Sequence, residues 1–280
     1  SRKLRVFING FGRIGRTLTR QILCGHGGAR VEIAGINDIA SFDTCAYLLR
    51  YDSVYGNFPF PIEAQSNGLL IRGRLIPVTH APDLRTLDLR DVDVVLDCTG
   101  KAGVRAFAEA GIAAGASKVL ISGPSATADQ TIVIGANDQD LRDARIVSNA
   151  SCTTNAIAPL LRILDLGLGI ERAHVTTVHC YTGSQPTVDQ PNGPPERSRA
   201  AAVSMVPTTT SAAEQVTRVL PEFAGRLTVS ALRVPCLSVS AVDAVVQLLE
   251  DPEEPFPDFL RAAFAGSSLV GLCEDPCVSS

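Results

Sequence analysis

A cysteine and a histidine are the residues best suited to covalent chemistry in this sequence. Cys152 lies in the stretch SNASCTTN (148–155), directly before an apolar helical pattern. Small hydroxyl and amide residues favour helix N-caps, so we expect Cys152 in the first turn, where free N–H groups favour a thiolate. His179 follows an apolar strand pattern and is the usual proton acceptor for a thiol. We interpret the two as nucleophile and base, although spacing alone also allows a core cysteine and a hydrogen-bonded histidine.

A glycine-rich loop indicates a second kind of chemistry, the binding of a dinucleotide. The loop reads G-x-G-x-x-G from Gly10 to Gly15, between a strand and a helix. Gly10 allows a tight turn, Gly12 lets a pyrophosphate approach the backbone, and Gly15 lets helix and strand pack closely. Asp38 ends the next strand and suits hydrogen bonds from ribose hydroxyls. Its charge would repel a 2′-phosphate and favours NAD over NADP; a helix N-cap is the alternative role.

The elements that position the glycine loop alternate between strands and helices. Apolar strand patterns cover 4–8, 31–36, 92–97, 118–122 and 131–135, with a β pair at 69–79. Helical patterns begin at Ile14 and Ser41 and cover 103–114. Gly25 and Gly27-Gly28 are expected to end the first helix. Continuous apolar strands that alternate with helices predict a parallel sheet covered on both faces.

The pattern changes near residue 150, where we place a domain boundary. Helix-like spacing follows Cys152, with a bend expected at Pro159. Long β-rich stretches follow at 174–178, 227–234 and 239–249, with a proline-rich loop at 183–199. The sequence therefore predicts an α/β fold. A Rossmann-type parallel-sheet cofactor domain (1–150) precedes an α+β catalytic domain (151–280) with a mixed or antiparallel sheet.

The composition excludes several classes of protein. The 280 residues are 45% apolar, which is typical of a globular chain. The net charge of −4 and the absence of a basic stripe argue against a nucleic-acid binder. No apolar run is long enough for a transmembrane helix or a signal peptide. The eight cysteines form no C-x-x-C pair. We therefore expect no metal site and no disulfide framework, and mostly buried thiols in a reduced, cytoplasmic protein.

Two longer motifs carry a resemblance to a known family. The stretches INGFGRIGR (8–16) and SNASCTTN (148–155) resemble the opening and the cysteine signature of phosphorylating glyceraldehyde-3-phosphate dehydrogenases. Shorter matches are Tyr51-Asp52-Ser53, Asp97-Cys98-Thr99-Gly100, Thr177-Val178-His179-Cys180-Tyr181-Thr182-Gly183, Pro207-Thr208-Thr209-Thr210 and Leu232-Arg233-Val234-Pro235. The resemblance runs from residue 4 to residue 280.

The resemblance implies a reaction and a set of site residues. Cys152 would attack glyceraldehyde 3-phosphate to form a thiohemiacetal, with His179 as acid–base catalyst. Hydride transfer to NAD would leave a thioester, and inorganic phosphate would release 1,3-bisphosphoglycerate. The implied phosphate-binding residues are Thr182 and Arg233 for the substrate, and Ser151, Thr153, Thr210 and Ser211 for the attacking phosphate. The implied cofactor residues are Gly10, Gly12, Arg13, Ile14, Gly15, Asp38, Thr99 and Ser122. The family also implies a homotetramer in the cytoplasm. Pro191 matches a proline of the family that is associated with a preference for NAD over NADP.

Several positions depart from the family pattern. Ser211 replaces a glycine and could crowd the attacking phosphate, and Ala102 replaces an aromatic residue that stacks on adenine. The usual basic run is reduced to ERSR (196–199). The family continues beyond Ser280 with an asparagine that binds the nicotinamide, so this chain resembles a member truncated at its C-terminus. We expect such a chain to bind NAD weakly and to turn over slowly.

Two alternative functions stay open at this point. An erythrose-4-phosphate dehydrogenase shares the cysteine, the histidine and NAD, although Tyr181-Thr182-Gly183 looks more like the glyceraldehyde type. A non-catalytic dinucleotide-binding remnant is the alternative from another class, and the presence of both Cys152 and His179 argues against it.

Overall fold

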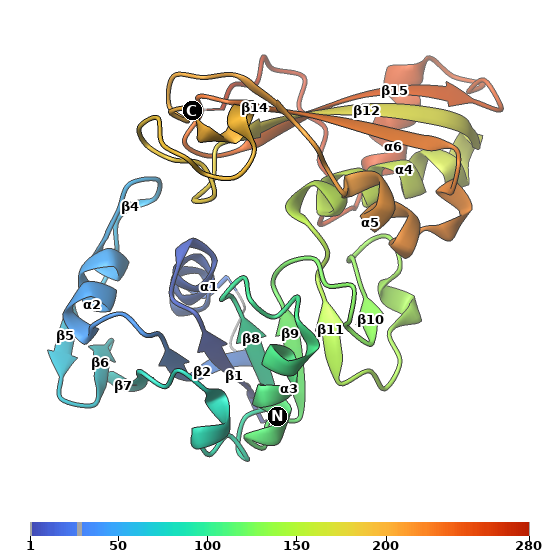
Figure 1. Ribbon diagram of the computed structural model, residues 1–280. Coiled ribbons are helices and arrows are strands. Elements are labelled where there is room, and N and C mark those ends of the chain that lie inside the picture. The colour runs from blue at the N-terminus through green and yellow to red at the C-terminus, as the bar shows by residue number, and fades with distance from the viewer. Residues whose placement is uncertain (1, 27–29, 280) are drawn as a thin grey trace. The chain divides into compact units, whose positions relative to one another are not determined.

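The computed structural model of the chain describes residues 2–26 and 30–279 (Figure 1). Gly27 and Gly28, which were expected to end the first helix, lie outside these residues. The chain divides into two compact units, one formed by Ser1–Ile132 and Asp140–Ala150 and the other by Val133–Gln139 and Ser151–Ser280. None of the helices in the described ranges has the length and apolar character needed to cross a membrane.

A nine-stranded sheet forms the centre of the first unit. Its order is β10-β11-β9-β8-β1-β2-β7-β6-β5, parallel from β10 to β7 and antiparallel from β7 to β5. The strands are β1 (Leu4–Asn9), β2 (Val31–Asn37), β5 (Ile62–Gln65), β6 (Gly68–Ile71), β7 (Arg74–Thr79), β8 (Val94–Asp97), β9 (Lys118–Ile121), β10 (Gln130–Thr131) and β11 (Ile146–Ser148). Strands β3 (Tyr51–Asp52) and β4 (Gly56–Asn57) pair separately. The predicted Rossmann-type parallel sheet is confirmed.

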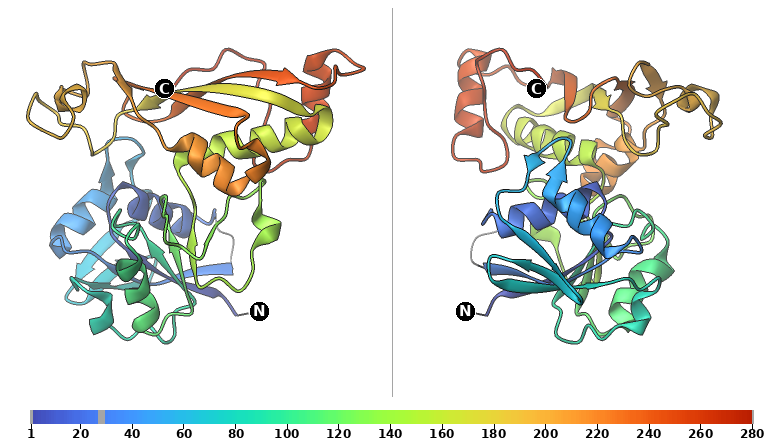
Figure 2. Two further views of the ribbon diagram at one scale, coloured as in Figure 1. Left: turned by 45° about the vertical axis from the view of Figure 1, so that its right-hand side comes forward. Right: turned by 90° about the vertical axis from the view of Figure 1, so that its left-hand side faces the viewer.

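Helices cover both faces of this sheet because its strands are apolar on both sides. Val6 and Ile8 of β1 belong to one apolar cluster, and Phe7 between them belongs to another. Successive strand residues point to opposite faces, so the two clusters lie on opposite sides of the sheet. The helices are α1 (Arg13–Leu23) and α2 (Phe42–Arg50), which pack on the first cluster, and α3 (Arg105–Ala113), which packs on the second (Figure 2).

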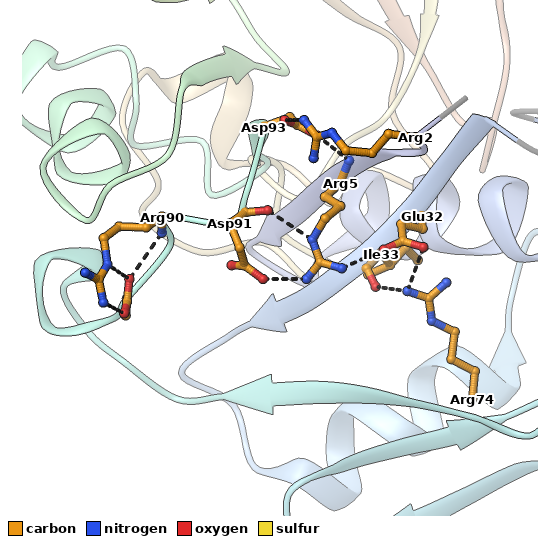
Figure 3. Close-up of polar contacts among 9 residues, drawn as sticks. Arg2, Arg5, Glu32, Ile33, Arg74, Arg90, Asp91 and Asp93 are labelled. Carbon is orange, nitrogen blue, oxygen red and sulfur yellow. Dashed lines mark hydrogen bonds and ion pairs between the residues drawn. The ribbon is translucent and has the colours of Figure 1, made fainter.

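A charge network ties together the ends of the strands opposite the glycine loop (Figure 3). The guanidinium of Arg5 on β1 pairs with Glu32 on β2 at 2.6 Å and with Asp91 at 2.6 Å. Asp93, just before β8, accepts the Arg5 backbone N–H at 2.8 Å. Arg74 on β7 reaches Glu32 at 3.4 Å. Half-exposed pairs of this kind contribute little free energy, but they link β1, β2, β7 and the start of β8 in one register.

The second unit is built on a four-stranded mixed sheet, as expected. Its order is β13-β14-β12-β15, with β12 parallel to β14 and antiparallel to β15. The strands are β12 (Ile170–Cys180), β13 (Val206–Thr208), β14 (Leu227–Val234) and β15 (Ser240–Leu248), and the helices are α4 (Cys152–Leu168), α5 (Ala212–Val219) and α6 (Phe256–Phe264). Ala173, Val175 and Thr177 of β12 are buried on one face of the sheet, and α4 and α5 lie against this sheet (Figure 2).

The structure differs from the sequence predictions in several elements. The strand expected at 131–135 is reduced to Gln130–Thr131, and β11, which was not predicted, pairs beside it. A bend is expected at Pro159 from the sequence, and the structure has one helix, α4, that continues through Pro159 from Cys152 to Leu168. The buried residues Ile157 and Leu161 flank Pro159, and their packing outweighs the backbone hydrogen bond that proline cannot make.

Candidate active site

Cys152 is the first residue of α4, and the local sequence explains why the helix begins there. The hydroxyl oxygen of Ser151 accepts a hydrogen bond from the Thr154 N–H at 3.1 Å, so Ser151 is the N-cap. The Cys152 side chain is exposed at the end of the helix where backbone N–H groups have no intrahelical partners. A helix N-terminus is a position at which such donors and the helix dipole can interact with a negatively charged group.

His179 lies next to Cys152 although it is 27 positions later in the sequence. It stands near the end of β12, is 8% exposed, and places Nε2 at 3.2 Å from the Cys152 sulfur. Its other nitrogen, Nδ1, lies 2.6 Å from the carbonyl oxygen of Cys180. A carbonyl oxygen only accepts hydrogen bonds, so the neutral ring carries its proton on Nδ1. Nε2 is therefore left to accept the proton of the Cys152 thiol.

Burial sets the protonation state of His179. Its pKa is lowered mainly by burial and further by the charge of Arg233, while the bond to the Cys180 carbonyl opposes this change. The neutral imidazole is thus favoured, and a neutral imidazole is the form that acts as a general base.

Arg233 places a cation beside the same histidine. The register of β12 with β14 pairs His179 directly with Arg233. Nη1 of Arg233 donates to the Cys180 carbonyl at 3.1 Å and to the Thr182 hydroxyl at 3.2 Å. Burial lowers the pKa of Arg233, and the nearby Cys152 opposes this effect. An arginine remains charged in proteins, so the site holds a cation with a planar fork suited to phosphate oxygens.

Hydroxyl side chains flank Cys152 in the chain and also precede α5. The Ser151 hydroxyl lies 3.0 Å from that of Thr153 and 2.7 Å from that of Thr154. The Thr210 hydroxyl accepts the Ala212 N–H at 3.1 Å at the start of α5, and Ser211 is the exposed N-cap position there. Ser151 and Thr153 thus lie on either side of Cys152 in the chain. Thr182 accepts a hydrogen bond from Arg233. Thr210 and Ser211 belong to the turn before α5.

Arg197 is a site residue that the sequence analysis did not single out. Its Nε donates to the Thr208 hydroxyl at 2.9 Å, and its positive charge contributes to the lowered pKa of Arg233. The guanidinium groups of Arg197 and Arg233 are therefore close enough for their charges to interact. The sequence signal for Arg197 is the pair of basic residues in the segment 196–199.

Gly10 and Gly12 of the glycine loop line a cavity of about 480 Å³ in the first unit. Gly10 has φ of 91°, and a Cβ there would come within 2.8 Å of the Cys98 backbone; a Cβ on Gly15 would lie 2.0 Å from the Gly10 carbonyl oxygen. Gly12 faces open space. Both close approaches require glycine, and the open face at Gly12 leaves room for a phosphate at the start of α1. The loop therefore fits a dinucleotide.

The cavity includes some of the predicted cofactor residues and some that were not predicted. Gly10, Gly12, Asp38 and Thr99 line it, whereas Arg13, Ile14, Gly15 and Ser122 lie outside its lining. Among the further residues that line it without a sequence signal are Arg85, Lys101 and Phe107.

Asp38 anchors the glycine loop through both oxygens. One accepts the Phe11 N–H at 2.6 Å and the other accepts the Ala40 N–H at 2.7 Å. The N-cap of α2 is Ser41, so the alternative role of Asp38 as a helix cap is wrong. The carboxylate still lines the cavity with acceptor capacity to spare.

The other cysteines divide into buried and exposed groups. Burial raises the pKa of Cys98 and of Cys45 to about 11, so neither forms a thiolate near neutral pH. Only Cys45 and Cys180 are fully buried, while Cys24, Cys152, Cys273 and Cys277 are exposed. The expectation of mostly buried thiols is therefore wrong.

Comparison with known proteins decides the family. The model for the NAD-binding domain of glyceraldehyde 3-phosphate dehydrogenase matches residues 4–104, and the model for the C-terminal domain of that enzyme matches residues 151–280. The chain belongs to the glyceraldehyde-3-phosphate dehydrogenase family. A glyceraldehyde-3-phosphate dehydrogenase of Pseudomonas aeruginosa is 43% identical over 99% of this chain and 84% of its own length. One from Xanthobacter flavus is 41% identical over 99% of this chain and 84% of its own length. Glyceraldehyde-3-phosphate dehydrogenase 2 of Bacillus subtilis is 39% identical over 99% of this chain and 83% of its own length.

Membership in the glyceraldehyde-3-phosphate dehydrogenase family settles two expectations. The first unit contains the family's NAD-binding domain, so NAD is the cofactor. The chain is an NAD-dependent dehydrogenase. The fold expected from strand and helix patterns and the family expected from the cysteine motif are both confirmed.

Proposed function

We propose that this chain oxidises glyceraldehyde 3-phosphate to 1,3-bisphosphoglycerate through a thioester on Cys152, with inorganic phosphate as the second substrate. The observation that carries the proposal is the 3.2 Å contact between the Cys152 sulfur and Nε2 of His179, beside the cation of Arg233. Nucleophile, base and phosphate-binding cation all belong to one unit, whose fold fixes their separation.

The first step joins the aldehyde to the enzyme. Nε2 of His179 takes the thiol proton, and the Cys152 sulfur attacks the carbonyl carbon of the aldehyde. The proton moves from Nε2 to the former carbonyl oxygen, which gives a neutral thiohemiacetal. The N–H groups at the start of α4 stabilise the charge on sulfur before the attack.

The second step oxidises the thiohemiacetal. Bound NAD supplies the hydride acceptor. Nε2 of His179 removes the proton of the thiohemiacetal hydroxyl, so that the carbonyl of the thioester re-forms on Cys152. Because Nδ1 of His179 stays bonded to the Cys180 carbonyl, the ring keeps one orientation through both proton transfers.

Phosphate recognition divides between two groups of side chains. Arg233 and Thr182, 3.2 Å apart, bind the phosphate carried by the substrate. The hydroxyls of Ser151, Thr153 and Thr210 orient the inorganic phosphate that attacks the thioester, with Ser211 beside them. The acyl phosphate leaves, and the Cys152 thiolate is regenerated.

We further infer a homotetramer in the cytoplasm, with the loop 183–199 at a subunit contact, on the strength of the family resemblance. Light scattering on the purified protein measures the assembly directly. A monomer in solution would contradict this part of the proposal.

The substrate assignment is tested by steady-state kinetics with two aldehydes. We expect glyceraldehyde 3-phosphate to give a higher kcat/KM than erythrose 4-phosphate in the presence of NAD and inorganic phosphate, and we expect arsenate to replace phosphate. A preference for the four-carbon aldehyde would assign the chain to the erythrose-4-phosphate type. Binding of NAD without turnover of either aldehyde would indicate a non-catalytic dinucleotide-binding protein.

A further inference from the structure

Two exposed cysteines lie together near the end of the described chain, apart from the catalytic pair. Cys273 and Cys277 are both exposed, and three residues separate them in sequence. Their thiols point to one acceptor, the carbonyl oxygen of Asp275, at 3.7 Å from Cys273 and 3.4 Å from Cys277. Because both sulfurs lie next to the same oxygen, they are at most about 7 Å apart, and a disulfide requires them to approach to about 2 Å.

The two thiols also interact directly. A hydrogen bond with Cys273 raises the pKa of Cys277, and the charge of an ionised Cys273 adds to this effect. One of the two protons is therefore lost before the other. The resulting combination of one thiolate and one neighbouring thiol is the arrangement in which a disulfide forms by exchange.

We propose that Cys273 and Cys277 form a reversible disulfide in exchange with small-molecule disulfides of the glutathione type. One cysteine thiolate attacks a sulfur of the small disulfide, which forms a mixed disulfide and expels one small thiolate. The second cysteine thiolate attacks the protein sulfur of the mixed disulfide and expels the other. Two cysteine thiols are oxidised to one protein disulfide, the small disulfide is reduced to two thiols, and the two cysteine protons pass to them.

The surroundings make this pair a redox site rather than a structural bridge. A disulfide here closes a loop of only a few residues, so it constrains the unfolded chain little and adds little stability. Both sulfurs are exposed and therefore open to reductants, which is typical of labile disulfides. Glu274, between the two cysteines, pairs with Arg261 of α6 at 2.7 Å.

Two other thiols supply internal comparisons. Cys24 is equally exposed, but it has no second cysteine in its own segment. Cys236, after β14, donates to the hydroxyl of Ser279 at 3.3 Å, and Ser279 is two positions after Cys277, so Cys236 is an alternative partner for Cys277. A disulfide between Cys236 and Cys277 is therefore the competing product.

The test uses the Cys152→Ala variant, which removes the catalytic thiol, incubated with oxidised glutathione and digested with trypsin without reduction. The sequence from Ala262 to Ser280 contains no lysine or arginine, so one peptide carries Cys273 and Cys277 and no other cysteine of this chain. We expect this peptide to be lighter by the mass of two hydrogen atoms and to regain that mass with dithiothreitol. The peptide with Cys24 should carry glutathione instead.

In the peptide that begins at Ala262, the amount of internal disulfide should exceed the amount of glutathione adduct by roughly tenfold or more, because the second attack is intramolecular.

Single substitutions provide the matched controls. Cys273→Ser and Cys277→Ser should each leave a stable glutathione adduct on the remaining cysteine, since no neighbouring thiol resolves it. A glutathione adduct that persists on the unsubstituted pair, as on Cys24, would overturn the proposal. So would an unmodified pair, or a cross-link between this peptide and the one that contains Cys236. None of these readouts depends on dehydrogenase activity, so the proposed function can fail while this proposal stands.

Discussion

His179 and Arg233 hydrogen-bond to the same oxygen, the carbonyl of Cys180, at 2.6 and 3.1 Å. The shared acceptor connects the proposed base to the proposed phosphate-binding cation through one peptide group. The parallel register of β12 and β14 places the two residues opposite each other, so the sheet itself positions both functions. A substitution of either residue is therefore expected to alter the hydrogen bonding of the other.

Replacement of His179 by asparagine tests its role as acid–base catalyst. We expect His179→Asn to lower kcat by roughly 10²–10⁴, the usual contribution of a positioned acid–base group. Alkylation of Cys152 by iodoacetate should slow near neutral pH. His174, an exposed histidine on the same strand, provides the control, and His174→Asn should leave kcat unchanged. If His179→Asn changes only KM, the residue has a binding role instead.

The titration of His179 tests its electrostatic environment. In the Cys152→Ala variant, burial and the Arg233 charge should hold the pKa of His179 below the ordinary value of 6.5. NMR of the ring Hε1 proton as a function of pH measures this pKa. Because the unfolded chain binds this proton more tightly than the folded chain, the contribution of His179 to stability should fall as the pH drops below 6.5 and approaches the folded pKa. A pKa above 6.5 would contradict the assignment.

Substitution of Arg233 by lysine separates charge from geometry. Lysine keeps the positive charge but loses the planar guanidinium, whose Nη1 contacts both Cys180 and Thr182. We expect the KM for glyceraldehyde 3-phosphate to rise roughly 10- to 100-fold, as for the loss of one charge-assisted hydrogen bond. Arg199, exposed and paired with Asp189 at 3.0 Å, gives the matched control Arg199→Lys. Equal effects of the two substitutions would refute a specific role for Arg233.

Asp38 should govern the choice between NAD and NADP. Asp38→Ala removes the carboxylate that lines the cavity, and we expect a rise of roughly 10- to 100-fold in the Kd for NAD. The preference for NAD over NADP should narrow because a 2′-phosphate is no longer repelled. Fluorescence titration with both nucleotides measures the two affinities. Asp43→Ala, in the exposed first turn of α2, removes a nearby charge and should change neither. A parent protein that already prefers NADP would invalidate the role of Asp38.

The local features of both sites could be predicted from the sequence because short-range rules determine them. Ser151 caps α4 as its residue type predicts, and this places Cys152 in the first turn. The close contact at Gly15 and the positive φ of Gly10 follow from the spacing of the glycine motif. Such features depend on a few neighbouring residues, and their sequence patterns are specific.

The long-range features could not be predicted because they depend on strand pairing and loop paths. Cys152 and His179 meet only because α4 and β12 are consecutive elements packed face to face. Arg197 acts near Arg233 because an irregular loop returns to β13, and no periodic pattern encodes that path. Pro159 shows the same limit, since tertiary packing preserves a helix that local propensity would end.

The central claim, a thioester on Cys152, is tested most directly by trapping the acyl enzyme. The protein is mixed with glyceraldehyde 3-phosphate and NAD without inorganic phosphate, quenched in acid, and digested. We predict a 3-phosphoglyceroyl group on the tryptic peptide Ile146–Arg162, whose one cysteine is Cys152. The group should be lost on addition of phosphate before the quench, and the Cys152→Ala variant should show neither the group nor turnover. NADH formation without acylation of this peptide, or acylation at another cysteine, would contradict the account.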